Sequence, residues 1–546
     1  MCGSFAGTGS AQGSQPLHQW KWGGMRDSGA SIGALLLAVL ACFFGMGAGA
    51  GHAWPEAEAP AALEVGAISD LDLASVRRIL DESDDVGMPA IRESRALSLE
   101  QAVQVSLQNN LGLQVVALDV EVAEFGVKSA RSKFHPVFGI TGRAAETKRA
   151  HSDPTRPDEF TENQEAQAIV QQQVPTGGSV AVGLGYAREF KNEFNEFSSG
   201  VGAGAGANLE SVSELGGLGI EIRQPLLKGG RVYVARRAIL DAEYDTAIRR
   251  AELQAEILEV SAGTKIAYYK VVQAMRQIEV IEQALARDEE LVRASDALFE
   301  AGRVSKVDVY SAQISRSNNQ ARLATTRADL ELVQNDLRKV VGLAVAVHVE
   351  VTDLTIPFEP LEIELENWIE RALESRPEMA VMRGRLEKAE LQVRIAENDT
   401  LPTLDVSGGF QPGFDWKSWN WNAGVGFEYA IGNVGPKSRL GQARARQART
   451  RQDYVRQKRE IELDVRAVEI RLREGVDRLK SLILQVENAR SKGEIARGRF
   501  EMGLASNLDI TDADAEQVRS ESLLLAALVE YASNRARMEA SIGGPL

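Results

Sequence analysis

Apolar residues recur every three or four positions over long stretches of this chain. In one stretch they step by four, three, four, four, three, four and three, at Ile461, Val465, Val468, Leu472, Val476, Leu479, Ile483 and Val486. This seam predicts a long helix with a partner helix beside it, and the Arg, Glu, Lys and Gln on its other faces predict contact with water. The stretches from about Ala235 to Glu300 and from about Lys437 to Met502 lack Pro. Each would form a helix about 100 Å long at about 1.5 Å per residue.

Shorter helices accompany the two long ones. One is expected at about 306–341 and another at about 507–541, each after a short Gly-Ser segment. A helix of about 38 residues is expected to end just before Pro136, and another just before Pro402. Two shorter helices placed end to end match the length of one long helix. We therefore expect each long helix to pair with two stacked shorter ones.

Strict alternation of apolar with small or polar residues predicts strands in two regions, 137–224 and 403–431. The strands after Pro402 are about 9–11 residues long, the length of a tilted transmembrane strand. Loops are expected at 143–162 and 191–211, and Pro175-Thr176-Gly177-Gly178 predicts a turn, which leaves the number of strands open. The cluster of Trp416, Trp419 and Trp421 favours a membrane-interface girdle, with a surface loop of a soluble sheet as the alternative.

The chain contains an internal duplication. Residues 97–142 align without a gap on residues 363–408, so that Pro136 falls on Pro402. Residues 299–309 (FEAGRVSKVDV) align on residues 500–510 (FEMGLASNLDI). Convergent amphipathic helices would explain the apolar matches but not the Gly, Pro and Asp matches. We therefore expect two repeats, residues 97–350 and 351–546, each with a helix, strands and a long helical hairpin.

The first part of the chain carries a targeting segment. A charged stretch precedes the apolar run Ala30–Ala50, and small residues follow it, which predicts a signal peptide over residues 1–53; a transmembrane anchor is the alternative. Cys42 ends a loose lipobox and is a candidate lipidation site. Residues 54–96 are acidic and form an N-terminal extension outside the repeats.

Composition excludes several classes of function. The chain has 546 residues, a net charge of −15, five His and two Cys. The negative charge argues against a nucleic-acid partner, and the scarcity of His and Cys argues against a metal centre or a disulfide framework. Neither a catalytic constellation nor a cofactor motif stands out. We therefore expect no enzyme activity, no cofactor and no metal.

The strand count has a further consequence. One copy of the chain has too few strands to close a barrel, and open strand edges cannot persist in lipid. Several copies must then share one barrel.

These features together resemble the TolC-like outer membrane efflux protein family. The matching marks are the repeated segments that lead to Pro136 and Pro402, Gln224-Pro225-Leu226-Leu227 with Gly229-Gly230, and two Gly-x-x-Ser-x-x-Asp turns. The resemblance implies a mainly α fold with transmembrane β-strands. Duplicated long α-hairpins would form a periplasmic α-barrel, and a trimer would share one β-barrel among the lipids of the outer membrane.

The same resemblance assigns a role to the two turns. They would be the periplasmic tips that contact a periplasmic adaptor (membrane fusion) protein bound to an inner-membrane transporter; the alternative is a plain coiled-coil turn without a partner. The tip residues are Gly302, Arg303, Val304, Ser305, Gly503, Leu504, Ala505 and Ser506.

Acidic residues beside the tips are the candidate gate. Asp509 and Asp512 match a D-x-x-D pair that would form acidic rings at the entrance and favour cations; charge complementarity with the helix N-terminus is the alternative. Asp308 matches the Asp of a lock whose other partners are an Arg and a Tyr. Here Phe500 replaces the Tyr and Ala505 the Arg, so this lock lacks its donors.

Two functions follow. The first is a passive exit duct of a tripartite efflux or type I secretion system, and the second is a periplasmic coiled-coil adaptor or scaffold without a pore. The alternating strands and the Trp cluster favour the duct. Neither the exported substrate nor the type of pump can be inferred from these residues.

Overall fold

Two very long helices dominate the computed structural model, α6 (Arg237–Glu300) and α10 (Val434–Glu501). Each reverses at a short turn into a helix that returns beside it, α7 (Lys306–Val341) after α6 and α11 (Asn507–Ser541) after α10. The returning helices have the residue bounds that the sequence predicts, because a Ser starts each one and Gly342 in a left-handed conformation ends the first.

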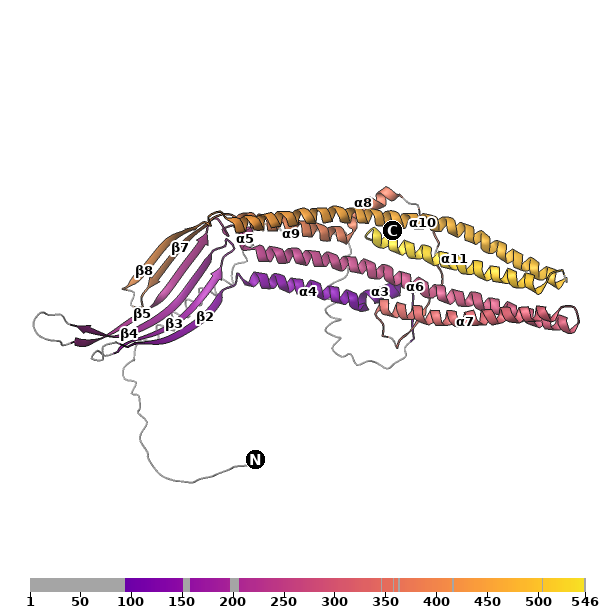
Figure 1. Cartoon of the computed structure of the whole chain (residues 1–546), viewed down its shortest axis with the longest axis horizontal. Helices are drawn as coiled ribbons and strands as arrows, with labels where there is room; N and C mark the ends of the chain where they lie inside the picture. The colour runs from indigo at the N-terminus through magenta and orange to yellow at the C-terminus, as the bar shows by residue number, and fades with distance from the viewer. Residues whose placement is uncertain are drawn as a thin grey trace, which may run out of the picture. The chain divides into compact units, whose positions relative to one another are not determined.

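The helices lie in four side-by-side positions (Figure 1). The first position holds α4 (Leu111–Ser132) and α7 end to end, and the second holds α6. The third holds α9 (Pro377–Asp399) and α11 end to end, and the fourth holds α10. The predicted pairing of each long helix with two stacked shorter ones is therefore confirmed.

The predicted 38-residue helices are wrong in one respect, because each is broken into two. Helix α3 (Leu99–Asn109) ends at Asn110, whose side chain accepts from the Leu113 amide and so also starts α4. Helix α8 (Leu365–Ser375) ends at Arg376, because Pro377 opens α9 and pushes the preceding residue into an extended conformation.

A small sheet joins the start of the first repeat to its end. Strand β1 (Ser94–Leu97), the end of the predicted extension, pairs in parallel with β6 (His348–Val351). The hydroxyl of buried Tyr268 on α6 donates to the Leu97 carbonyl at 3.2 Å and accepts from the Asp353 amide at 3.0 Å. This bridge fixes both strands to the middle of the longest first-repeat helix.

The larger sheet has six antiparallel strands in the order β2-β3-β4-β5-β7-β8. It lies at one end of the helices (Figure 1), with β2 on the side of α4 and β8 on the side of α10. The strands are β2 (Val137–Arg149), β3 (Glu159–Gln173), β4 (Ser179–Glu196), β5 (Gly206–Pro225), β7 (Thr403–Pro412) and β8 (Trp419–Glu428).

The two loops predicted in the first repeat are wrong over part of their length. Strands β2 and β3 continue into the predicted loop 143–162, and β4 and β5 continue into 191–211. Charged and amide residues on both faces interrupt the alternation in their outer halves, apart from a few apolar residues such as the paired Phe190 and Val212, and cross-strand pairing supports these parts of the strands. The predicted turn at Pro175–Gly178 is confirmed as the link between β3 and β4.

The predicted apolar seam of α10 is confirmed except at one position. Ile461, Val465 and Leu472 are fully buried, but Ile483 is 48% exposed and Leu482 takes its place in the core. The buried series continues through Val486 and Ala489 to Gly493. These buried positions, from Ile461 to Gly493, keep the alternating steps of four and three of a single heptad seam, and Ile483 lies one position beside it.

The structure describes residues 94–544 apart from 151–157, 197–205, 345, 357, 362–363, 415–416 and 503. The predicted signal peptide, the candidate lipidation site Cys42, most of the extension, Trp416 and Gly503 lie outside the described residues. No helix within the described ranges is long and apolar enough to cross a membrane.

Candidate functional site

The two hairpin tips are built by the same local interactions. At the first tip, Gly302 has a φ of 70°, and the Arg303 amide donates back to the Leu298 carbonyl at 2.8 Å. Ser305 then caps α7: its amide donates to the Asp308 carboxylate at 2.9 Å, and its hydroxyl accepts from the Asp308 amide. A left-handed residue allows the tight reversal, and the reciprocal cap fixes the start of the returning helix.

The second tip repeats this geometry. The Leu504 amide donates to the Arg499 carbonyl at 2.8 Å, and Ser506 forms the same reciprocal cap with Asp509, with its amide 2.8 Å from the carboxylate. The remaining described tip residues, Val304 and Ala505, are half-buried, whereas Arg303 and Leu504 are exposed. The predicted tips thus present short exposed turns of fixed shape.

A buried Asn ties the two tips together within one chain. Asn507, the first residue of α11, is fully buried. Its side-chain amide donates to the Ser295 hydroxyl of α6 at 2.5 Å and to the Asp308 carbonyl of α7 at 3.0 Å. One side chain therefore links three helices of two different hairpins. In the sequence, Asn507 is recognisable only as the residue after a capping Ser, so its links between the two hairpins could not be predicted.

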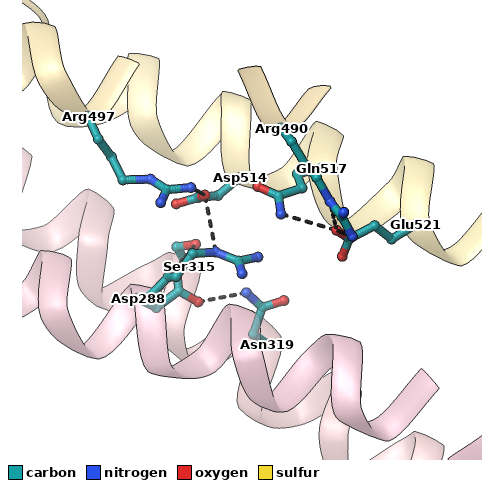
Figure 2. A network of polar contacts seen from close by, with 9 residues as sticks. Asp288, Ser315, Asn319, Arg490, Arg497, Asp514, Gln517 and Glu521 are labelled. Carbon is teal, nitrogen blue, oxygen red and sulfur yellow. Dashed lines mark hydrogen bonds and ion pairs between the residues drawn. The ribbon is translucent and has the colours of Figure 1, made fainter. Parts of the chain in front are cut away.

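On the side of the tips that faces the sheet, a polar network crosses the interface between the two hairpins (Figure 2). Asp514 of α11 lies 3.2 Å from an Arg497 nitrogen of α10 and 3.3 Å from Nε of Arg287 of α6. Asp288, the neighbour of Arg287, accepts from Ser315 at 2.8 Å and from Asn319 at 2.6 Å, both on α7. Two buried carboxylates thus hold four helices in register.

Burial governs the electrostatics of this network. Asp514 is 6% exposed and Asp288 is 2% exposed. Removal from water raises the pKa of Asp514 above its ordinary value; Arg497 and Arg287 oppose this rise, and Asp288 adds to it. A buried charge that loses its partners is strongly destabilising, so the separation of the two hairpins here carries a high cost.

The predicted ring residues have separate partners. The Asp509 carboxylate accepts from the amide and the hydroxyl of Ser506, and these hydrogen bonds lower the pKa of Asp509. Asp512 is largely exposed and lies 3.0 Å from Nζ of Lys492 on α10. Within one chain, the first carboxylate caps its helix and the second forms a surface ion pair.

The two predicted gate residues, Asp308 and Phe500, make other contacts than those that the lock of the family would need. The Asp308 carboxylate is occupied by Ser305, and only its main-chain carbonyl reaches the other hairpin. Phe500 packs against an apolar cluster formed by Leu291, Val292, Ala312 and Ile510. Apolar packing and Asn507 thus connect the hairpins where the lock would use an Arg and a Tyr.

The six-stranded sheet has two chemically different faces. Directly paired residues share a face, and one face gathers the large apolar side chains, from Phe138 and Ile140 on β2 to Val425 and Phe427 on β8. Most of them are exposed in the single chain. The other apolar-face residues are Val170, Val180, Val182, Leu184, Tyr186, Leu218, Ile220, Ile222, Leu404, Val406, Phe410 and Trp421.

The opposite face carries small, amide and charged side chains. They include Gln167, Gln171, Asn422 and the ion pair between Arg223 and Asp405 at 2.6 Å. On the apolar face, the first charged pair on β4 and β5 is Arg188 with Glu214, at 3.5 Å. At about 3.3 Å per residue, the distance along β4 from Val180 to Arg188 is about 26 Å, close to the apolar band of an outer-membrane barrel.

The two described Trp residues of the predicted aromatic girdle share one face of the sheet. Trp421 lies opposite Phe410, and Trp419 lies opposite Pro412, two residues further along the same two strands. Both are exposed. The described residues contain no group of His, Cys, Asp and Glu suited to a metal ion.

Comparisons with known proteins agree with this geometry. The chain matches the family model described as "Outer membrane efflux protein" over residues 191–343 and 368–544. It is 28% identical over 261 residues to the outer membrane efflux protein BepC of Brucella suis, a match that covers 44% of this chain and 54% of BepC. It is 22% identical over 339 residues to TolC of Escherichia coli, covering 56% of this chain and 66% of TolC. The chain thus matches about half to two thirds of these relatives' length.

Solved structures share the fold over more of the chain. The outer-membrane channel OprN has a TM-score of 0.62 and 20% identity, covering 82% of this chain and 90% of OprN. The outer membrane protein VceC of Vibrio cholerae has a TM-score of 0.59 and 17% identity, covering 82% of this chain and 96% of VceC.

Proposed function

The chain belongs to the outer membrane efflux protein family, the TolC-like outer membrane factors, and from this premise we propose that three copies form one passive exit duct. Members of this family are outer membrane channels rather than enzymes. The duct would be the outer component of a tripartite efflux or type I secretion system. The energy for export would come from the pump.

One observation carries this proposal, the six-stranded sheet with an apolar face, a polar face and two outer strands, β2 and β8, paired on one side only. In lipid an unpaired strand edge is costly, so β2 of one copy would pair with β8 of the next until the ring closes. The apolar face would then contact lipid and the polar face would line the pore. A scaffold without a pore would not need a sheet with one apolar face and one polar face.

The helices offer matching surfaces for the same assembly. On α4 an apolar stripe steps by four, three, four and three and is exposed in the single chain, at Leu111, Val115, Leu118, Val122 and Phe125. On α10, at the other side of the helical layer, Val455 and Leu463 are exposed at and near the level of this stripe, and Ile470 and Leu484 are exposed farther from the sheet. The seam of α4 needs a partner helix, and α10 of a second copy would supply it.

The tips would contact the periplasmic adaptor. Around the two turns, large apolar side chains are exposed on the outer surface, at Val307, Ile314, Met502, Leu504 and Leu508. Exposed apolar groups near charged ones mark protein-binding surfaces. The adaptor would link this end to an inner-membrane transporter.

Asp509 and Asp512 would form acidic rings at the entrance of the trimer. Their exposure and their position at the start of α11 support this role, although Asp509 also caps the helix and Lys492 offsets the charge of Asp512. Such rings would favour cations at the constriction.

The test is fractionation followed by channel recording. The full chain should sediment with outer membranes, require detergent for extraction and form trimers that conduct ions in planar bilayers. Recovery as a periplasmic protein that is soluble without detergent would overturn the duct and favour the scaffold.

A further inference from the structure

The two repeats contribute unequally to the sheet. The second repeat supplies two strands, β7 and β8, whereas the first supplies four, β2 to β5. Strand β2 corresponds to β7, because each follows the aligned Pro136 or Pro402, and β5 corresponds to β8, because each leads into a long helix. The difference is therefore the hairpin of β3 and β4, residues 159–196, which we call the extra hairpin.

The turn of the extra hairpin is tightly built into the junction between sheet and helices. Gly177 has a φ of 88°, and a Cβ on it would lie 2.1 Å from the Gly229 carbonyl oxygen. The side chain of Gln224 accepts from the Thr176 hydroxyl at 2.8 Å and donates to the Thr176 carbonyl at 3.0 Å. The junction thus has a close-packed place for this turn.

A second anchor lies on the other side of the hairpin. The side-chain amide of Gln172 on β3 donates to the Phe134 carbonyl, just after α4, at 3.1 Å. The hairpin also carries both chemistries of the sheet, with Val182 and Leu184 on the apolar face and Gln167 and Gln171 on the polar face. The extra hairpin therefore extends both the apolar face and the polar face of the six-stranded sheet.

The extra hairpin makes the sheet as wide as the helical layer. Six strands about 4.8 Å apart and tilted by about 40° occupy an arc of about 38 Å. Four helix positions about 9 Å apart occupy about 36 Å. Four strands, two from each repeat, would occupy only about 25 Å by the same spacing and tilt.

We infer that three copies close an 18-stranded barrel, three times six, whose wall continues the ring of helices without narrowing. Its backbone diameter would be about 36 Å, against about 24 Å for a barrel of twelve strands. This inference rests on the proposed trimeric duct and adds the width of its membrane passage. Barrels of 16–18 strands enclose an aqueous channel. The barrel would therefore pass bulky or chain-like cargo such as polypeptides, and selection by size would occur at the periplasmic tips.

The direct test is a cryo-electron microscopy map of the full chain in nanodiscs. A trimer with 18 strands in its barrel is the expected result. A trimer with a barrel of twelve strands, with the extra hairpin outside the wall, would overturn this inference and leave the duct intact. A protein that forms no trimeric barrel would overturn the proposed function itself.

A deletion variant gives a functional comparison. Removal of residues 159–205 joins β2 to β5 and leaves two strands in the first repeat. In planar bilayers, polyethylene glycols added from the extracellular side should enter the wild-type barrel up to a diameter about one and a half times that for the variant, since barrel diameter grows about linearly with strand number. Equal limits for two correctly inserted trimers would contradict the wider barrel. If the variant does not insert, the strand count of the wild-type map decides.

Discussion

Single buried polar side chains determine how the two hairpins of one chain hold together. Asn507 joins α11 to Ser295 of α6 and to the main chain at Asp308 of α7. Asp514 lies between two Arg side chains from different hairpins. Neither residue belongs to a motif, and their partners are distant in the sequence, so periodicity could not identify them. Ser305 and Ser506 were predictable, since a capping Ser followed by Asp three residues later is a local pattern.

Substitution of Asn507 by Ala should loosen the tips. The change removes both donors and leaves the Ser295 hydroxyl and the Asp308 carbonyl with one partner fewer in a buried place, at a cost of about 2 kcal/mol. Hydrogen exchange at the start of α11 and the end of α6 should become faster, and trypsin should cut the tips sooner. Thr511→Val is the matched control, because the Thr511 hydroxyl bonds only within its own helix. Equal exchange in both variants would contradict this link.

Asp509 and Asp514, on the same helix, should respond to acid in opposite directions. Burial raises the pKa of Asp514 in the folded chain, so its contribution to stability increases as the pH falls through that raised pKa toward the ordinary value of 3.8. Hydrogen bonds from Ser506 lower the pKa of Asp509, so its contribution is present above 3.8 and is lost as the pH falls through the lowered pKa.

Thermal unfolding of the Asp→Asn variants at each site separates these two effects. We expect the melting temperature of the wild type minus that of Asp514→Asn to rise as the pH is lowered toward 3.8. We expect the melting temperature of the wild type minus that of Asp509→Asn to fall as the pH is lowered below 3.8. Shifts of the same sign in both variants would refute the assignment.

At the scale of elements, the sequence determined the long helices better than the short ones. Long stretches without Pro marked α6 and most of α10, the apolar seam marked α10 as well, and caps marked α7 and α11. The break at Asn110 has no Pro, and its signals, an Asn that can cap a helix and Gly112 two residues later, are weak beside the continuous apolar periodicity that predicted one helix. The outer halves of β2 and β3 lack alternation because both of their faces are polar, and their pairing depends on contacts across strands.

The turn of the extra hairpin offers a sharp test at this scale. Gly177→Ala would place a methyl group against the Gly229 carbonyl and force a non-Gly residue into a left-handed conformation, at a cost above about 2 kcal/mol. The yield of heat-resistant trimer on gels should fall. Gly185→Ala on β4 is the control, because a Cβ there meets no atom within 4 Å. Comparable trimer yields from both variants would show that this turn has no part in barrel formation.

At the scale of the whole molecule, the duplication was visible in the sequence, but the number of strands was not. The aligned segments predicted that both halves have the same order of elements, and the structure adds one hairpin to the first half only. Both long sides of the described unit remain without partners in a single chain, β2 with α4 on one side and β8 with α10 on the other (Figure 1).

Assembly should therefore be sensitive to a charge on the α4 stripe. Val122 is 68% exposed in the single chain and would be covered by α10 of the next copy. Val122→Lys should shift the protein from trimers to monomers in native mass spectrometry. Asp119→Lys places the same side chain at an exposed polar position beside the stripe and should leave most trimers intact. Intact trimers of Val122→Lys would mean that α4 faces water in the assembly.

The two unlike edges of the sheet also have a genetic consequence. A ring that closes by pairing β2 of one copy with β8 of the next fails when any one member has a damaged edge. If half of the copies in a cell are damaged in β8 but still pair through β2, only about one ring in eight is made of intact copies. Such an allele would be dominant over the wild-type gene, whereas a null allele would be recessive.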